Sequence, residues 1–450
     1  MTNSLLAGLR SSQFMRLLLL GFLVLLLLIP LARISDVIDE RASRRDEAVL
    51  EVTDKWGGEQ KLTGPVLVVP YTHRWSETNS KGVVIPHSEI RRAYFLPERL
   101  DVTGRIDAEE RARGIFSVQV YALDLAFAGT FARPDFAALG VQEAEVDWSK
   151  AELAVGISDV RAIQSTPSLT WAGEERAFLP GADACALAEN GIHVGVPLGP
   201  NGRAIEFAFP LRLHGSEGVW FVPFARDTTV AVESAWPSPS FQGSWLPGRR
   251  EVSPAGFRAG WSIPYLGRNY AQAFTGEELP AKAIEASRFG VRLVAPVDPH
   301  RMAQRSVKYG GLFILLTFAA IWMIEVLGRL RVHPIQYLLI GGALGLFFLL
   351  ELSLAEHLGF ALAYGAASAA VVGVVGAYAR AVLGRPRRAL AVAGMVAALY
   401  GYLYVLLTAE DFALLFGSLG LFAILSAFMW LTRRVDWYQA TSGAALQSEA

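Results

Sequence analysis

The chain begins with one long apolar run, and several more follow in its last third. Residues 17–29 form an unbroken apolar segment that Phe14 extends backwards and further apolar residues extend to position 34. About 20 helical residues cross the roughly 30 Å hydrocarbon core of a bilayer, so the segment predicts a transmembrane helix. Arg10 and Arg16 precede it, and the residues after it match a signal-peptidase site poorly. We interpret residues 1–34 as a cytoplasmic N-terminus followed by an uncleaved membrane anchor.

Five further apolar segments follow residue 309. Their expected boundaries are 310–327, 337–354, 358–379, 389–408 and 412–431. The arginines between and after these segments fall only in alternate loops, and short loops rich in Lys and Arg stay in the cytoplasm. The pattern predicts six transmembrane helices with both termini in the cytoplasm, residues 310–432 forming a five-helix bundle and residues 433–450 a cytoplasmic tail. Residues 35–309 are then expected in the periplasm.

The segment between the anchor and the bundle has a different pattern. Residues 35–55 are rich in charge and predict a helix that continues from the first span. After residue 58, short β-branched and aromatic runs alternate with Gly, Pro and Asp, which is typical of antiparallel strands in a sandwich-like fold. The class is therefore an α+β membrane protein with a β-rich domain at 35–309. Similar strings at 113–116 and 217–220 leave open whether this domain contains one β module or two.

Composition supports the division into a polar middle and apolar ends. Hydrophobic residues make up 52% of the chain and charged residues only 18%, whereas soluble domains carry about 25% charged residues. Residues 35–309 hold 30 of the 41 Lys and Arg and 35 of the 42 Asp and Glu. The net charge of −1 does not suggest nucleic-acid binding. A single cysteine, Cys185, excludes an internal disulfide and a four-cysteine zinc site.

No sequence motif indicates catalysis, a metal or a cofactor. The nucleophile-elbow, zinc-protease and phosphate-loop patterns are absent, and the histidines between residues 73 and 300 show no ligand spacing. We therefore expect a protein that is not an enzyme, needs no cofactor and holds no metal. A hydrolase assembled from distant residues is the weakest alternative.

Two segments of the β-rich domain are candidate contact surfaces. One is the turn expected at 64–71, and the other is an aromatic and proline-rich loop formed by Trp236, Pro237, Pro239, Phe241, Gln242 and Gly243. Aromatic faces bind sugars or proteins with little loss of entropy. The alternative is structural, because Pro and Gly mark strand ends and corners.

The apolar segments contain few polar groups. Glu325 lies near one end of its span, where Arg329 is spaced to pair with it, and Glu351 is expected close enough to the outer end to reach the interface. The absence of ionisable residues at the centre of the expected spans disfavours ion-coupled transport. Tyr400, Tyr402 and Tyr404 are a candidate polar cluster in the membrane.

Several strings in this order resemble the CreD family of inner-membrane proteins, also called cell envelope integrity proteins. They are LTGPVLVVPY at 62–71, RGIF at 113–116 with VY at 120–121, WPSPSFQG at 236–243, FGV at 289–291 with PVD at 296–298, KY at 308–309, HPIQYLL at 333–339 and SLAEH at 353–357. The resemblance covers nearly the whole chain. It implies a protein of the bacterial cytoplasmic membrane that is linked to envelope stress, and it supplies no catalytic residues.

The sequence thus favours a protein that supports envelope integrity. Its periplasmic domain is expected to bind an envelope protein or glycan, while the bundle contacts the lipid bilayer. The alternative is a channel or transporter of a lipid or small molecule, which polar lining at 400–404 or an opening at 341–345 would favour.

Overall fold

The computed structural model describes residues 13–433 except 182–187, 200–203, 295–298, 329, 331 and 410–411. The chain forms two compact units, one of residues 1–46 and 297–450 and the other of residues 47–296. We call the first unit the bundle and the second the β-rich domain. Cys185, the arginines expected at 329 and 331, and the tail from residue 434 onward lie outside the described residues.

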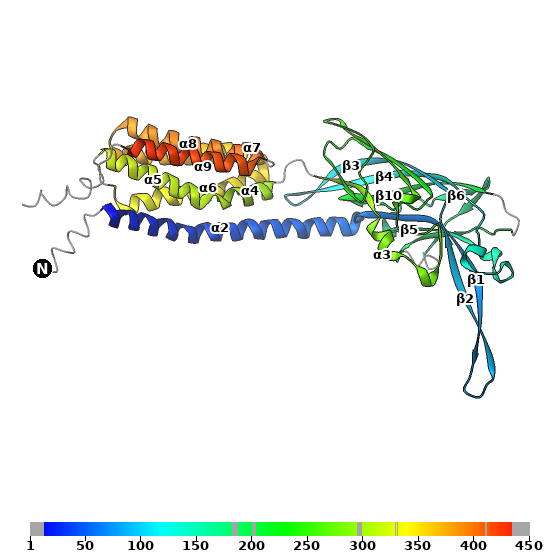
Figure 1. Cartoon of the computed structure of the whole chain (residues 1–450). Helices are drawn as coiled ribbons and strands as arrows, with labels where there is room; N and C mark the ends of the chain where they lie inside the picture. The colour runs from blue at the N-terminus through cyan, green and yellow to red at the C-terminus, as the bar shows by residue number, and fades with distance from the viewer. Residues whose placement is uncertain are drawn as a thin grey trace, which may run out of the picture. The chain divides into compact units, whose positions relative to one another are not determined.

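Helix α2 (Gln13–Trp56) contributes to both units (Figure 1). Its 44 residues correspond to about 66 Å at the usual helical rise, about twice the thickness of a hydrocarbon core. The charged second half remains helical through pairs four residues apart, such as Glu40 with Arg44 at 2.7 Å and Glu51 with Lys55 at 2.8 Å. The polar segment after the apolar run is therefore a direct continuation of the same helix.

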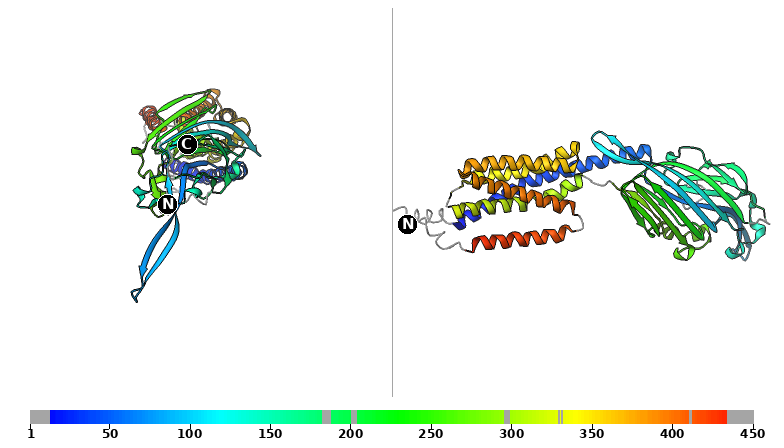
Figure 2. Two further views of the ribbon diagram at one scale, coloured as in Figure 1. Left: turned by 90° about the vertical axis from the view of Figure 1, so that its right-hand side faces the viewer. Right: turned by 90° about the horizontal axis from the view of Figure 1, so that it is seen from above.

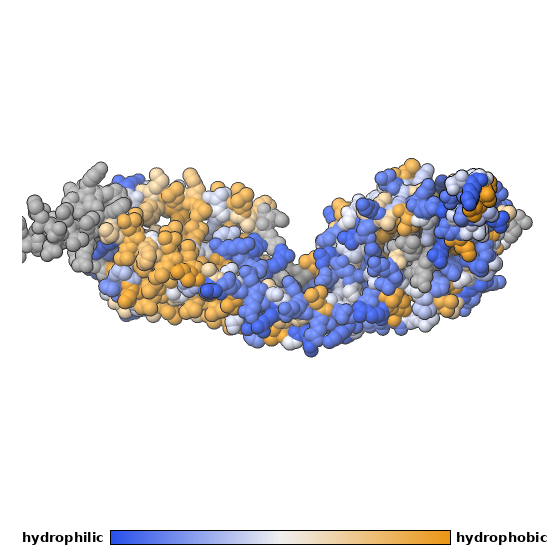
Figure 3. Space-filling model, turned by 90° about the horizontal axis from the view of Figure 1, so that it is seen from below, coloured by the Kyte–Doolittle hydropathy of each residue, from blue (hydrophilic) through white to orange (hydrophobic). Residues whose placement is uncertain are grey.

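The remaining bundle helices come from the last third of the chain. They are α4 (Pro299–Lys308), α5 (Gly310–Gly328), α6 (Pro334–Leu358), α7 (Phe360–Leu383), α8 (Pro386–Thr408) and α9 (Ala413–Thr432). Among the described residues, five helices are long and apolar enough to cross a membrane, with a sixth span if α4 and α5, bent by 44°, are counted together. On the face shown in Figure 3, apolar side chains gather over much of the bundle, as lipid contact requires.

Close helix contacts depend on small residues at a few positions. Gly341 on α6 faces Leu27 of α2, and a Cβ atom at this glycine would lie 2.2 Å from a Leu27 methyl group. Helix α9 differs from the other spans, because none of its residues is buried within the described structure. Its link to α8 includes a hydrogen bond from the Tyr402 hydroxyl to the Phe416 carbonyl.

The β-rich domain contains two sheets (Figure 2). In the nine-stranded sheet the order is β13 (Pro239–Gly243), β17 (Phe289–Leu293), β11 (Gly218–Phe221), β1 (Gln60–Thr78), β5 (Glu152–Ile157), β9 (Gly191–Gly195) and β8 (Leu179–Pro180), while β2 (Val84–Phe95) pairs with β1 and β16 (Ala273–Thr275) pairs with β2. The eight-stranded sheet has the order β14 (Arg249–Ser253), β15 (Gly256–Pro264), β12 (Asp227–Ser234), β3 (Arg99–Arg113), β4 (Phe116–Phe131), β10 (Ile205–Ser216), β6 (Ser168–Trp171) and β7 (Glu174–Ala177).

The buried faces of both sheets contribute to one hydrophobic core. Strand β12 shows how the sequence produces this arrangement: every second residue from Thr228 to Ser234 is buried, and the residues between them are exposed. Phe127 of β4 stacks on Phe209 of β10 with ring centroids 4.6 Å apart. The β-rich prediction is confirmed, although two strand pairs, β1 with β11 and β3 with β12, are parallel.

The two similar strings at 113–116 and 217–220 occupy different positions in this fold. The first forms the turn between β3 and β4 of the eight-stranded sheet, and the second leads into β11 of the nine-stranded sheet. Residues 47–296 form one compact unit.

An ion pair with a buried carboxylate links distant parts of the chain within the bundle. Arg16 Nη1 of α2 lies 2.5 Å from Glu325 Oε1 of α5, and the Tyr337 hydroxyl of α6 donates to the other carboxylate oxygen at 2.9 Å. Arg329, which the sequence suggested as the partner, lies outside the described residues. The carboxylate therefore joins α2, α5 and α6.

We predict that Arg16→Gln destabilises the purified protein by about 1–3 kcal/mol, because Glu325 is only 5% exposed and would keep a buried charge without its cation. Thermal unfolding in detergent measures the change. Arg33→Gln is the control on the same helix, since its pair with Asp36 is 82% and 66% exposed and is worth less than about 1 kcal/mol. Equal shifts for the two variants would contradict the prediction.

Candidate functional site: an arginine-lined groove

The exposed face of the eight-stranded sheet carries a ladder of charges in register. Strand pairing places oppositely charged residues side by side across six strands, in the order Arg212, Asp124, Arg105, Glu233, Arg258 and Glu251. Two neighbouring pairs form ion pairs, Arg212 with Asp124 at 2.5 Å and Arg258 with Glu233 at 3.3 Å. Opposite charges on adjacent strands stabilise this register.

The adjacent row of the same face has small side chains. The residues in register are Pro210, Ala126, Thr103, Ala231 and Gly260, followed by Arg249 at the edge strand β14. Because these side chains are small, they leave a depression in the sheet surface beside the charged row. This row forms part of a groove of about 880 Å³. A second groove of about 780 Å³ shares Arg105, Glu233, Arg250, Glu251 and Arg258 with it.

The groove has an excess of positive charge. Five arginines line it (Arg105, Arg212, Arg249, Arg250 and Arg258), against three carboxylates (Asp124, Glu233 and Glu251). Arg249 and Arg250 are exposed and form no ion pair with any described residue. Guanidinium groups recognise carboxylates and phosphates through paired hydrogen bonds. The groove can therefore bind an anionic group, and its described lining contains no aromatic ring on which a sugar would stack.

The end of α2 is fixed to the β-rich domain by a stack of three side chains. The Trp56 ring lies parallel to the His214 ring of β10 with centroids 3.8 Å apart. On Trp56, the Arg111 guanidinium of β3 lies 3.5 Å from the ring centroid. Burial and the nearby Arg111 charge lower the pKa of His214.

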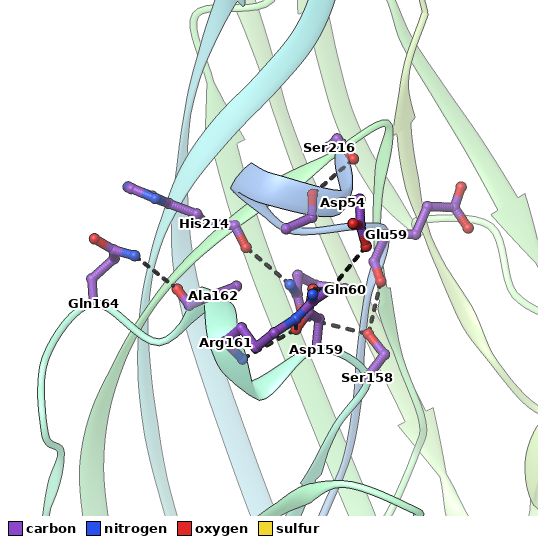
Figure 4. Close-up of polar contacts among 11 residues, drawn as sticks. Asp54, Glu59, Gln60, Ser158, Asp159, Arg161, Ala162, Gln164, His214 and Ser216 are labelled. Atoms are coloured by element: carbon purple, nitrogen blue, oxygen red, sulfur yellow. Dashed lines mark hydrogen bonds and ion pairs between the residues drawn. The ribbon is translucent and has the colours of Figure 1, made fainter. Parts of the chain in front are cut away.

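Hydrogen bonds strengthen this junction (Figure 4). Ser216 donates to the Gly57 carbonyl at 2.9 Å, and the Gln60 amide donates to the His214 carbonyl at 3.0 Å. Gly57 has a φ of +129°, and a Cβ atom there would lie 2.9 Å from Ala162. The chain can therefore turn from the helix into β1 only with glycine at this position.

Ion pairs lie beside the same junction. Arg161 contacts Asp159 at 3.0 Å and Asp54 of α2 at 3.3 Å, and its hydrogen bonds hold the pKa of Asp159 below the usual range (Figure 4). Tyr121 donates from its buried hydroxyl to the Gly218 carbonyl at 2.7 Å, and burial raises its pKa. These contacts make the helix end part of the domain.

The candidate contact loop connects the two sheets and contributes to the core. Pro237 lies between β12 of one sheet and β13 of the other, and Pro239 begins β13. The Trp236 indole donates to the Val294 carbonyl at 3.0 Å, and Phe241 packs edge-on against Phe257 and Trp261. These side chains are half-buried.

The end of this loop has a strict backbone requirement. Gln242 donates to Ser240 at 3.1 Å, whereas Gly243 has a φ of +100° and no room for a Cβ atom, which would lie 2.3 Å from the Arg288 carbonyl. The loop thus contributes to core packing and strand geometry, and its contact with a partner stays a prediction. The other segment, 64–71, is not a turn: it lies inside β1, where Val66, Leu67 and Val69 are 0% exposed, so it is not a contact surface.

The three tyrosines of α8 do not form a single cluster. Tyr400 and Tyr404 contact Tyr364 of α7, whose hydroxyl donates to the Tyr400 carbonyl at 2.6 Å, and these rings line a pocket of about 430 Å³ with Ser368. Tyr402 instead contacts α9. The expectation for Glu351 was wrong, because this residue is 0% exposed and does not reach an interface.

Among the described residues, no group of three or more His, Cys, Asp or Glu is arranged to hold a metal ion. The groove was missed at the sequence level because its parts come from six strands. The alternation of Thr103, Arg105 and Asp107 is typical of the exposed face of a strand, but only strand pairing joins it to Arg249 and Arg212.

An apolar anchor helix, a β-rich domain and several apolar helices define a membrane protein of the polytopic class. The family model described as "Inner membrane protein CreD" matches residues 12–438. Inner membrane protein CreD of Escherichia coli strain K12 is 34% identical over 441 residues, covering 96% of this chain and 95% of that protein. The chain belongs to the CreD family of inner membrane proteins, which confirms the resemblance seen in the sequence.

Solved structures add no functional argument. A substrate-bound M1 zinc metallopeptidase from Deinococcus radiodurans matches 48% of this chain and 54% of its own, with 10% identity and a TM-score of 0.20. Yeast LTA4 hydrolase matches 50% of this chain and 35% of its own, with 11% identity and a TM-score of 0.19.

The lowered pKa of His214 predicts a pH-dependent junction. Above about pH 6.5 the residue is neutral in both folded and unfolded chains, whereas at lower pH the unfolded chain takes up the proton more readily. Stability therefore falls as the pH decreases through about 6.5 towards the lower folded value. We expect a loss of less than about 1 kcal/mol, because the ring is half-exposed.

Thermal unfolding of the full chain, followed by tryptophan fluorescence at about pH 7.5 and about pH 5.5, measures this effect. His214→Phe keeps an aromatic ring on Trp56 and removes the titrating group. The variant should lose less stability than the wild type on acidification. An identical loss in both proteins would assign the pH dependence to other groups.

Proposed function

We propose that this protein supports the integrity of the bacterial envelope by binding an anionic envelope component through its β-rich domain. The observation that carries the proposal is the groove of about 880 Å³, in which Arg249 and Arg250 remain available to a ligand. The other three arginines of the lining already have carboxylate partners. The ligand, a protein or a glycan, would supply the missing negative charge.

The proposed setting follows from the family and the charge pattern. Inner-membrane family membership places the apolar helices in the cytoplasmic membrane. The arginines of alternate loops support six spans with both termini in the cytoplasm, which would place the β-rich domain in the periplasm. The groove would then face envelope components.

The junction at the end of α2 fixes the last residues of this helix within the β-rich domain. Trp56 is stacked and hydrogen-bonded within the β-rich domain, while the helix that ends there starts as a membrane span. The residues that connect the first span to the β-rich domain are therefore helical throughout. This supports a role in anchoring or signal transmission.

A second candidate function is transport of a lipid or small molecule by the bundle. The pocket of about 430 Å³ between α7 and α8, lined by Tyr364, Tyr400 and Tyr404, favours it. Flux measurements in reconstituted vesicles test this candidate, and a leak or uptake lost in Tyr404→Phe would support it.

Photocrosslinking in cells tests the binding proposal. Photoreactive residues at positions 103 and 231 place the probe on the floor of the groove, and a probe at position 282 on α3 (Ala281–Ala286) is the control. We expect repeated capture of one envelope component from the groove probes only. Mass spectrometry and glycan staining then identify the captured molecule as a protein or a glycan.

Charge reversal tests which residues carry the binding. Arg249→Glu combined with Arg250→Glu should reduce capture by on the order of tenfold, equivalent to about 1.4 kcal/mol, because the ligand would meet repulsion where it met unpaired cations. Lys282→Glu is the matched control, an exposed cation outside the groove. No specific capture at either groove position would overturn the proposal.

A further inference from the structure

Helix α6 places a carboxylic acid in the interior of the bundle. Glu351 is 0% exposed and lies about 10 Å along the helix from the last residue, Leu358. Its neighbours on α6 include the buried rings of Phe347 and Phe348. A fully buried ionisable residue within a membrane bundle is rare and needs a physical explanation.

The contacts of this carboxyl group are few. One oxygen lies 2.9 Å from the Ser306 hydroxyl of α4, and the other oxygen is buried without a hydrogen-bond partner. Within the described ranges, Glu351 takes part in no ion pair. A second buried acid of the bundle, Glu325 of α5, has a different environment: its carboxylate contacts both a cation, Arg16, and the Tyr337 hydroxyl.

The charged groups around Glu351 are directed to other partners. From α2, Arg41 faces Glu356 at 3.9 Å, and from α4, His300 faces the same carboxylate at 3.9 Å. Arg305 of α4 donates to the Leu406 carbonyl of α8 at 3.3 Å. From α7 and α8, the Tyr364 and Tyr400 rings pack against Phe347, and the Tyr404 ring packs against Tyr364.

This environment suits the neutral acid and not the carboxylate ion. Burying an ion costs more than one neutral hydroxyl restores. A neutral carboxylic acid needs fewer hydrogen bonds than the ion. With one oxygen bonded to Ser306, the other oxygen is left without a partner but carries no charge.

We propose that Glu351 is a proton-binding site inside the bundle, and that its protonated side chain, hydrogen-bonded to Ser306, holds α4 against α6. The ligand is a single proton exchanged with solvent. Release of the proton leaves a buried negative charge, which is relieved when α4 separates from α6 and admits water. The 44° bend between α4 and α5 supplies the point about which α4 can move.

The site would link protonation to the segment that leads from the β-rich domain back into the bundle. Helix α4 begins at Pro299, directly after the last strand and its connection, and packs on α6 and α8. This inference does not depend on the ligand of the groove. The sequence argument against ion coupling considered only the centres of the expected spans, whereas Glu351 is fully buried nearer the end of its helix.

Hydrogen–deuterium exchange of the full chain in lipid nanodiscs tests the proposal. Exchange of the α4 amides is measured between about pH 5 and about pH 9 and corrected for the intrinsic rate of exchange. In the wild type, protection of α4 should fall by at least about tenfold as the pH rises. In Glu351→Gln, which keeps a neutral hydrogen-bonding side chain, protection should stay high at every pH.

Control variants separate Glu351 from its charged neighbours. His300→Gln and Glu356→Gln should keep the pH response of α4, while Ser306→Ala should reduce protection even at low pH. Flat protection in the wild type, or a response that persists in Glu351→Gln, would overturn the proposal. If Glu351→Gln does not fold, infrared spectroscopy of the wild type decides: Glu351→Asp should shift the carboxylic-acid carbonyl band, and absence of any protonated-acid band would refute the site.

Discussion

The start of the β-rich domain depends on the C-terminal end of helix α2, which side-chain stacking holds in place. Helix α2 begins as an apolar span and ends at Trp56, which lies between His214 and the Arg111 guanidinium. Aromatic stacking and a cation over the ring gain strength where water is excluded, and the Trp56 indole also donates to the Tyr121 carbonyl at 3.3 Å. The first strand then starts from a fixed position, because Gly57 permits a turn that no other residue accommodates.

The membrane helices could be predicted from the sequence better than the topology of the sheets. Apolar length predicted the helices well, because lipid forces every span to satisfy its own backbone and to expose apolar side chains. The orientation that loop charge indicates stays a prediction. Short β-branched and aromatic runs predicted strands, and in β12 every second residue is buried because one face of the strand enters the core. Strand order and the two parallel pairs were not predictable, because they depend on contacts between residues more than a hundred positions apart.

The same distinction explains what was missed at the sites. The two candidate contact segments were chosen for their Gly and Pro residues. In the structure, Gly243 is required by the backbone geometry and Val66 is part of the hydrophobic core. The groove is lined by residues that belong to no sequence motif. Its charged row forms only when strand pairing brings Arg212, Asp124 and Arg105 side by side. Glu351 was misjudged for a related reason: distance from the end of a span does not determine exposure when another helix, α4, covers that position.

Two acids in the bundle show how their partners decide their roles. Glu325 meets Arg16 and the Tyr337 hydroxyl, so its charge is compensated and it acts as a structural link among three helices. Glu351 meets only the Ser306 hydroxyl, so the bundle tolerates it best without charge. The first acid therefore links α2, α5 and α6 through fixed partners, whereas the second makes the packing of α4 on α6 depend on a proton.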